Sequence, residues 1–314
     1  ARLGEIQREY RQDGPAAISA YRDALERDPR NSVSRLGLDA LLEQDALRGG
    51  VLDILEPLYE GEGDNSKLVS LLQQRLTTLT DPLDRVAILN RIATIQEDEL
   101  GAAEAALETV CAALAIETSD IQLIERSEAL ARSADRFGML VDATTEILSG
   151  NVDSDTLEHL AVRLGIWQLD QMNDVDGAEK TFRRVLAELP ECVPAFDALE
   201  RIYRAGDDAG LATLLWQRAE LTYDLQQKKE LLSEVGGLRR NSLDDAPGAI
   251  VAWKAVIDAD DADARALQEL AELYRADSQW VSLIETLERK AELTESPEER
   301  AQIKHEAADV LRSQ

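Results

Sequence analysis

Histidine and cysteine, the side chains most often used for proton transfer and metal binding, are scarce in this sequence. There are two histidines, His159 and His305, and neither has a second His or a Cys at helical spacing. Metal binding by a helix usually needs such a pair, four residues apart on one face. We therefore interpret both histidines as exposed or partly packed helix residues, without a role in metal or proton chemistry.

The two cysteines, Cys111 and Cys192, stand far apart in segments with helical patterns, so no disulfide framework is implied and a reducing compartment is expected. Cys111 lies among apolar residues, a setting that raises the pKa of a thiol and predicts an inert core side chain. Cys192 lies near a helix start, where the dipole could lower its thiol pKa. No basic neighbour supports a reactive role there.

Two clusters of carboxylates raise the hypothesis of calcium binding. Residues 258–263 contain four aspartates but lack the glycine, the ligand spacing and the terminal glutamate of an EF-hand loop. We interpret them as a hairpin turn that caps the helix beginning near Ala264. A second cluster is interpreted as a solvated loop: Glu56, Glu60, Glu62 and Asp64, with Gly61 and Gly63.

Other catalytic patterns are missing from the sequence. It contains no glycine-rich phosphate loop, no nucleophile elbow and no plausible set of Ser, His and carboxylate. The tryptophans fall on apolar helix stripes and are interpreted as core rather than as a ligand cage: Trp167, Trp216, Trp253 and Trp280. We expect no catalytic, cofactor-binding or metal-binding residue, and the binding residues stay unassigned.

Composition excludes several classes of partner. The chain carries 34 basic and 62 acidic residues, a formal charge of −28. Such a field repels phosphate backbones and anionic lipid headgroups, so neither nucleic acid nor a membrane surface is expected as a partner. No run of 18 apolar residues predicts membrane insertion. The acidic field would attract a basic protein. Alternatively, the acidic residues only keep the protein soluble, which explains the charge equally well.

The elements that carry these residues repeat along the chain. Residues 177–185 recur as 248–256, displaced by 71 positions, and residues 198–205 recur as 269–276 at the same displacement. Each unit of about 71 residues divides into four segments with apolar residues at spacings of three and four, which is typical of amphipathic helices. Gly, Pro and Asp separate the segments. We therefore expect about eighteen helices and no strand.

These repeats resemble the tetratricopeptide repeat family, a 34-residue helical hairpin with small residues at helix contacts, an aromatic residue in the second helix and a terminal proline. The copies are Ala178, Phe182, Val185 and Pro190, and Ala17, Tyr21, Ala24 and Pro29. A glycine precedes the alanine by twelve or thirteen residues in three copies: Gly4, Gly165 and Gly237. The resemblance implies peptide or protein binding on a superhelical surface.

The sequence thus predicts an all-α, right-handed superhelical solenoid of stacked antiparallel hairpins. We expect Ala17, Ala178 and Ala249 to be buried at equivalent helix contacts. Tyr203 and Tyr274, 71 residues apart, should be partly buried against the next hairpin. We expect a single array, a fragment of a longer protein because the chain starts without Met, with these approximate units: 1–65, 66–137, 138–208, 209–279 and 280–314.

The leading functional hypothesis is a non-catalytic scaffold that binds protein partners, with its oligomeric state left open. One alternative is a regulatory or accessory repeat module of a larger enzyme or of a secretion or motility machine. An enzyme in its own right is the least supported alternative. The cytoplasm is the expected compartment, or the periplasm if a leader or parent protein was removed.

Overall fold

The computed structural model describes residues 1–313, and every regular element within that range is a helix. The chain divides into two compact units, Ala1–Met172 (unit 1) and Asn173–Gln314 (unit 2), and each is described by itself.

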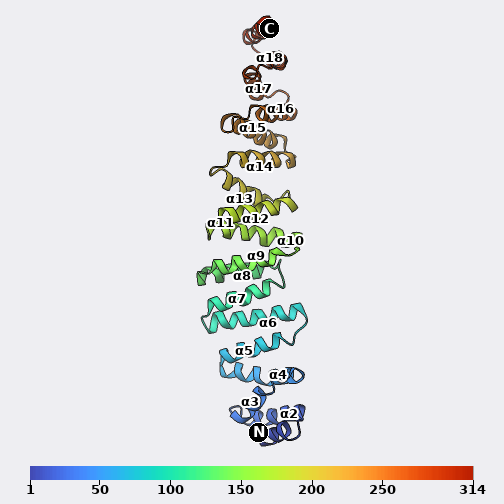
Figure 1. The fold of residues 1–314 in the computed structure, drawn as a ribbon, viewed down its shortest axis with the longest axis vertical. Coiled ribbons are helices and arrows are strands. Elements are labelled where there is room, and N and C mark those ends of the chain that lie inside the picture. The colour runs from blue at the N-terminus through green and yellow to red at the C-terminus, as the bar shows by residue number, and fades with distance from the viewer. Residues whose placement is uncertain (314) are drawn as a thin grey trace. The chain divides into compact units, whose positions relative to one another are not determined.

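Unit 1 contains eleven α-helices and two π-helical turns. In Figure 1 its helices run in colour from blue at the N-terminus to yellow-green at α11. They are α1 (Arg2–Glu9), α2 (Gly14–Arg27), α3 (Ser32–Asp39), α4 (Asp45–Glu62), α5 (Asn65–Leu76), α6 (Pro82–Thr94), η1 (Ile95–Glu99), α7 (Ala103–Leu114), α8 (Ile121–Ala134), α9 (Phe137–Ser149), α10 (Ser154–Thr156), η2 (Leu157–Ala161) and α11 (Val162–Asp170).

Unit 2 contains the remaining eight helices. They are α12 (Val175–Glu188), α13 (Val193–Tyr203), α14 (Asp208–Leu221), α15 (Leu225–Asn241), α16 (Ala246–Ala259), α17 (Ala264–Ala276), α18 (Trp280–Leu293) and α19 (Pro297–Ser313).

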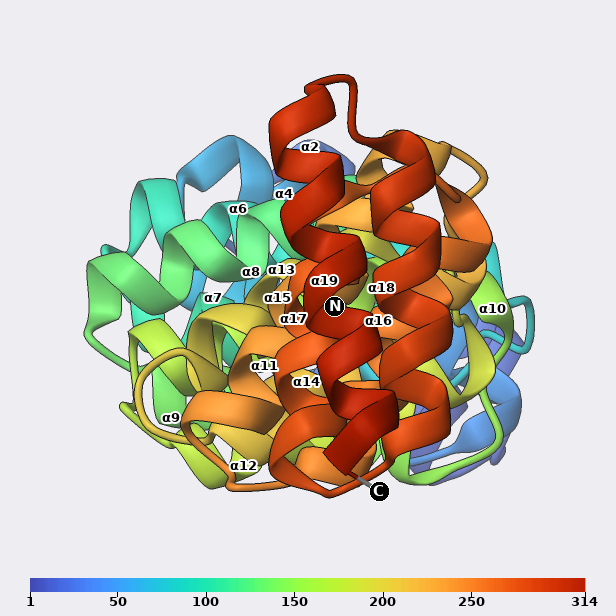
Figure 2. The ribbon, with the colours of Figure 1, turned by 90° about the horizontal axis from the view of Figure 1, so that it is seen from above.

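The predicted all-α architecture is confirmed. Because α10, η2 and α11 continue as one helix over 154–170, the nineteen labelled α-helices form eighteen continuous ones among the described residues. Within each unit every helix packs on the next one in the chain, and α7 also contacts α9. Figure 2 shows α18 and α19 side by side. One superhelix running through both units stays a prediction.

Aspartate side chains begin most of these helices. Each accepts a hydrogen bond from a backbone N–H two or three residues further on, which satisfies one of the donors left free in the first turn. Ten aspartates and one asparagine cap in this way: Asp13, Asn31, Asp64, Asp81, Asp120, Asp153, Asp174, Asp207, Asp224, Asp245 and Asp263. Part of the acidic excess therefore defines the helix boundaries.

The repeated small residues lie at helix contacts, as the sequence predicts. Ala17, Ala178 and Ala249 are fully buried. One turn further along each helix an aromatic side chain is also buried, and it is Tyr21, Phe182 or Trp253. A methyl group followed by a large ring lets the neighbouring helix approach closely while the ring fills the remaining space.

Glycines on the preceding helix complete this contact. A Cβ on Gly4 would collide with the ring of Tyr21, and a Cβ on Gly236 would lie 2.6 Å from Cε2 of Trp253. The expectation for Gly237 is wrong, because a Cβ there would meet no atom within 4 Å. The contact position is Gly236, thirteen residues before Ala249, and Gly237 faces away from the ring.

Tyr203 and Tyr274 are more deeply buried than expected, at 4% and 3% exposure. The Tyr203 hydroxyl donates to Glu179 Oε1 at 3.0 Å and accepts from Arg183 Nε at 2.8 Å. The Arg183 guanidinium lies 5.7 Å from the Tyr203 ring centre, and Lys254 Nζ lies 5.8 Å from that of Tyr274. Because Arg183 and Lys254 are also 71 residues apart, each ring meets a basic side chain of the preceding helix at an equivalent position. Tyr203 also lies against the next helix, as predicted, since a Cβ on Gly210 of α14 would be 3.1 Å from its Cδ1.

The two adjacent glycines of α15 give a matched test of the crossing. Gly236→Ala should lower the free energy of unfolding by about 1 to 3 kcal/mol, because the new methyl group overpacks the contact with Trp253. Gly237→Ala should leave stability unchanged or raise it by about 0.5 to 1 kcal/mol, because alanine is the better helix former. Urea unfolding of the full chain measures both. Equal effects of the two substitutions would contradict the assignment of Gly236.

The buried tyrosines give a second test. Tyr203→Ala and Tyr274→Ala should each lower the free energy of unfolding by about 2 to 4 kcal/mol, as for other buried aromatic residues. Tyr203→Phe, which keeps the ring and loses only the hydroxyl, should cost about 1 kcal/mol. Urea unfolding and amide hydrogen exchange distinguish global loss from local opening. Changes within experimental error for both alanine variants would show that the rings do not support the packing.

Candidate functional site

The side chains with catalytic potential lie apart from one another. His159 is exposed in η2, and His305 lies on α19 with its Nε2 3.5 Å from Asp309 Oδ2. Cys111 is buried on α7, and burial, followed by the nearby charge of Glu108, raises the pKa of its thiol to about 11. The thiol is therefore protonated at neutral pH, as predicted for an inert core cysteine. Cys192 is half-buried at the start of α13.

Within residues 1–313 no three His, Cys, Asp or Glu side chains are placed to hold a metal ion. The tryptophans belong to the core, as predicted. Trp167 and Trp253 are buried, and Trp216 and Trp280 are half-buried against the hydrophobic core of unit 2.

Three aspartates of 258–263 contact basic side chains, and one of them also caps a helix. Asp260 and Asp263 contact Lys229 Nζ at 2.9 and 3.1 Å, and Asp261 contacts Arg289 at 2.9 Å. Asp263 also accepts from the Ala266 N–H at 2.8 Å, which confirms the predicted cap.

The second acidic cluster is not the predicted solvated loop. Glu56, Glu60 and Glu62 all lie on α4, which ends at Gly63 with a left-handed φ of 69°. Glu56 is only 8% exposed. Arginines of the next two helices contact Glu56 and Glu60, and Arg35 of α3 contacts Glu62, so these carboxylates are paired rather than only solvated.

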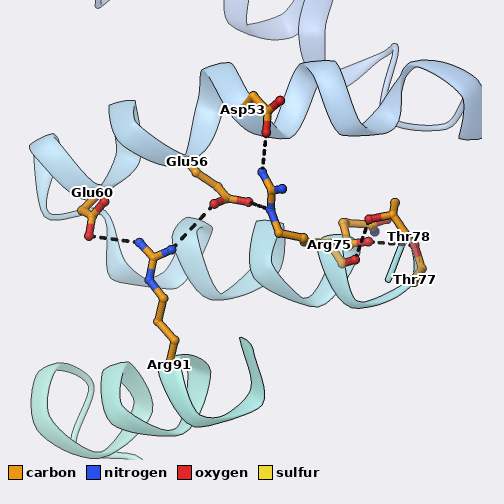
Figure 3. A network of polar contacts seen from close by, with 8 residues as sticks. Asp53, Glu56, Glu60, Arg75, Thr77, Thr78 and Arg91 are labelled. Carbon is orange, nitrogen blue, oxygen red and sulfur yellow. Dashed lines mark hydrogen bonds and ion pairs between the residues drawn. The ribbon is translucent and has the colours of Figure 1, made fainter. Parts of the chain in front are cut away.

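Figure 3 shows this network, in which Glu56 lies between two arginines. Arg75 on α5 contacts Glu56 through Nε and also contacts Asp53 Oδ1 at 2.8 Å. Arg91 on α6 contacts Glu56 Oε2 at 3.7 Å and Glu60 Oε1 at 3.0 Å. Three successive helices are thus joined through one largely buried carboxylate.

Similar Arg–Glu contacts recur at intervals of about one hairpin and connect alternate helices. In unit 1 they join Arg126 to Glu97 at 3.1 Å and Arg163 to Glu128 at 2.7 Å. In unit 2 they join Arg204 to Glu234 at 2.7 Å, Arg240 to Glu272 at 2.8 Å, and Arg275 to Glu306. Alternate helices therefore share a face in each unit. We call this set of contacts the arginine ladder.

The hydrogen-bond partners of one ladder carboxyl, Glu272, lower its pKa. The hydrogen bond from Arg240, followed by that from Gln268, holds the pKa of the Glu272 carboxyl below its ordinary value. A carboxyl whose pKa is lowered by folding stabilises the folded state above its unfolded pKa. This contribution is lost as the pH falls through the lowered value.

Acidic and basic residues differ in number and in how many of them are paired. Unit 1 has 32 acidic and 16 basic residues, a net charge of −16, and unit 2 has 30 and 18, a net charge of −12. Five arginines pair with glutamates in the ladder, whereas no ion pair among the described residues involves these exposed glutamates: Glu108, Glu146, Glu285 and Glu288. The solvent-facing surface of both units is therefore acidic.

Shallow grooves separate neighbouring helices on this surface. One of about 560 Å³ lies between α15 and the start of α17, and its lining includes Lys229, Glu234 and Arg265. Another of about 570 Å³ lies between α7 and α9. These are the concave features that a bound segment could occupy. No helix within 1–313 combines the length and the apolar character needed to cross a membrane.

Comparison with known proteins identifies one repeat of the array directly. Residues 266–301 match the tetratricopeptide repeat family, a segment that includes nearly all of α17, all of α18 and the first residues of α19. No curated protein matches the chain.

Several solved structures are similar. A tetratricopeptide repeat protein from Parabacteroides merdae is 16% identical with a TM-score of 0.30, over 85% of this chain and 96% of that one. Yeast Tom70 is 14% identical with a TM-score of 0.29, over 97% of this chain and 60% of that one. The TPR2AB domain of yeast Sti1 in a pHSP90 complex is 16% identical with a TM-score of 0.23, over 100% and 96%.

The buried carboxylate of the network gives a prediction with an internal control. Glu56→Gln should lower the free energy of unfolding by about 1 to 3 kcal/mol, because it removes the charge that both arginines contact in a largely buried setting. Glu60→Gln, at an exposed position with one arginine contact, should cost less than about 1 kcal/mol. Urea unfolding compares the two variants. A larger loss for Glu60→Gln would show that Glu56 does not organise the network.

Proposed function

Because this chain is a repeat protein of the tetratricopeptide type, we propose that it is a non-catalytic module. In this proposal it binds a partner protein through the acidic surface of its helical array. One observation carries the proposal: the arginine ladder pairs basic side chains with glutamates of alternate helices, while other exposed carboxylates have no basic partner among the described residues. A surface arranged in this way favours a partner with a basic or mixed-charge face.

The non-catalytic part of the proposal has separate support. His159, His305 and Cys111 lie on different helices, and the Cys111 thiol is protonated at neutral pH. A general base or nucleophile needs a partner within hydrogen-bond reach that adjusts its pKa. Neither histidine lines the grooves described above, and Cys111 shares its groove with no histidine or basic side chain.

The function is tested by affinity capture from the source cell, identification of the retained proteins by mass spectrometry, and binding of the purified partner to the full chain. We expect saturable binding of a protein with a basic or mixed-charge surface. Failure to recover any protein that binds after purification would contradict the proposed function.

The charge of the surface predicts how that binding responds to salt. The association rate should fall at least about tenfold between low and high salt, because exposed charges are screened over about 8 Å at physiological ionic strength. The dissociation rate should change less. Stopped-flow measurements over a series of NaCl concentrations give both rates. An association rate that does not respond to salt would remove electrostatic steering and leave acidity with a role in solubility alone.

A further inference from the structure

The groove between α7 and α9 in unit 1 combines a small, partly apolar floor with an open mouth. Its lining includes Ala112 from α7, Ala115 directly after α7, Ala143 and Ile147 from α9, and Val152 from the loop that follows. Ala112 and Ala115 are exposed, and the other three are half-buried. Apolar atoms therefore remain in contact with water at the bottom of a groove of about 570 Å³.

Carboxylates without basic partners surround this floor. Glu146 lines the groove directly, and Glu108 lies one turn before Ala112 on the exposed side of α7. Neither forms an ion pair among the described residues, and Glu108 is close enough to Cys111 to raise its thiol pKa. At one end the hydroxyls of Thr118 and Thr156 are 2.8 Å apart.

Basic side chains are missing from this part of the chain over long stretches. The sequence has no Lys or Arg between Arg91 and Arg126, and none between Arg136 and Arg163. Arg136 itself contacts Glu104, on the first turn of α7. Four other grooves each have a basic side chain in their lining: Lys229, Arg183, Arg91 or Arg22. The lining of the α7–α9 groove contains no basic side chain.

The dipoles of α7 and α9 add to the negative potential of the groove. The start of α10 also lines it, and the Asp153 carboxylate that caps α10 offsets the positive end of that helix. The last turns of α7 and α9, which hold Ala112 and Ile147, both line it. Neither last turn carries a basic residue. The C-terminal end of a helix has a partial negative charge that favours a nearby cation, and here two such ends are left without one.

We propose that the α7–α9 groove binds a basic amphipathic segment of the partner protein. The inference rests on the proposed function and assigns it a site. Small apolar side chains of the segment cover Ala112, Ala115 and Ile147, and its Lys or Arg side chains reach Glu108, Glu146 and the carbonyl groups at the two helix ends.

Charge decides against other occupants. A second copy of this chain would bring another net charge of −28 and would be repelled. Nucleic acids and anionic headgroups are repelled for the same reason. A basic protein segment satisfies both the apolar floor and the uncompensated carboxylates.

A defined probe tests the site on the full chain. The probe is a fluorescently labelled 18-residue peptide with Leu at spacings of three and four and Lys at the remaining positions, and its affinity is measured by fluorescence anisotropy at low salt. E108Q/E146Q should weaken binding at least tenfold. The control variant E285Q/E288Q makes the same charge change at exposed, unpaired positions of α18 and should weaken binding less than twofold.

A second variant tests the apolar floor. Ala112→Trp fills the groove from an exposed position and should weaken binding at least tenfold while the helical circular dichroism and thermal unfolding stay unchanged. Equal weakening by the two glutamine pairs would overturn the proposal, because only a diffuse acidic field would then bind the peptide. Unchanged affinity of Ala112→Trp would also overturn it.

The captured partner separates this inference from the proposed function. If E108Q/E146Q binds the purified partner as tightly as the parent chain does, the groove assignment fails and the protein-binding function stands. If no partner binds the parent chain, the function itself fails. A loss of at least tenfold for the groove variant, with the α18 control unchanged, supports both.

Discussion

The close contact between a bare glycine and an aromatic ring sets the distance between packed helices in both units. Gly4 faces Tyr21 in unit 1 and Gly236 faces Trp253 in unit 2, and the members of each pair are 17 positions apart in the sequence. A side chain at either glycine would displace the ring and push the helices apart. Because each hairpin stacks on the one before it, the grooves and ion pairs further along a unit depend on this spacing.

Once the helix spacing is fixed, the arginine ladder can form at regular intervals. A guanidinium on one helix reaches a glutamate on the next helix but one, as between Arg163 and Glu128 or between Arg204 and Glu234. Basic and acidic residues therefore have different structural roles. Arginines hold the layers in register, aspartates cap the helices, and the glutamates left over give the surface its negative potential.

The sequence correctly predicts the features that recur with the repeat. It predicts poorly the features that depend on which residues are neighbours in three dimensions. The 71-residue displacement correctly identifies Ala178, Ala249 and Tyr274 as buried, and periodicity correctly predicts an all-helical chain. The choice of Gly237 fails by one residue because two glycines are adjacent, and only the position of the Trp253 ring distinguishes them. The sequence wrongly places Glu56 in a loop, because its partners Arg75 and Arg91 are 19 and 35 residues away and a local sequence pattern does not reveal them.

The sequence does not predict binding residues, for a related reason. Acidic residues are so common here that no cluster of them is informative by itself, and composition gives only the average field. Selectivity within such a field needs a place where carboxylates lack internal partners and apolar surface is accessible nearby. The fold creates that difference: arginines neutralise glutamates along the alternate helices, whereas the ends of α7 and α9 meet without any basic side chain. In the function that we propose, the average charge accelerates encounter with a basic partner, and the local imbalance determines where that partner binds.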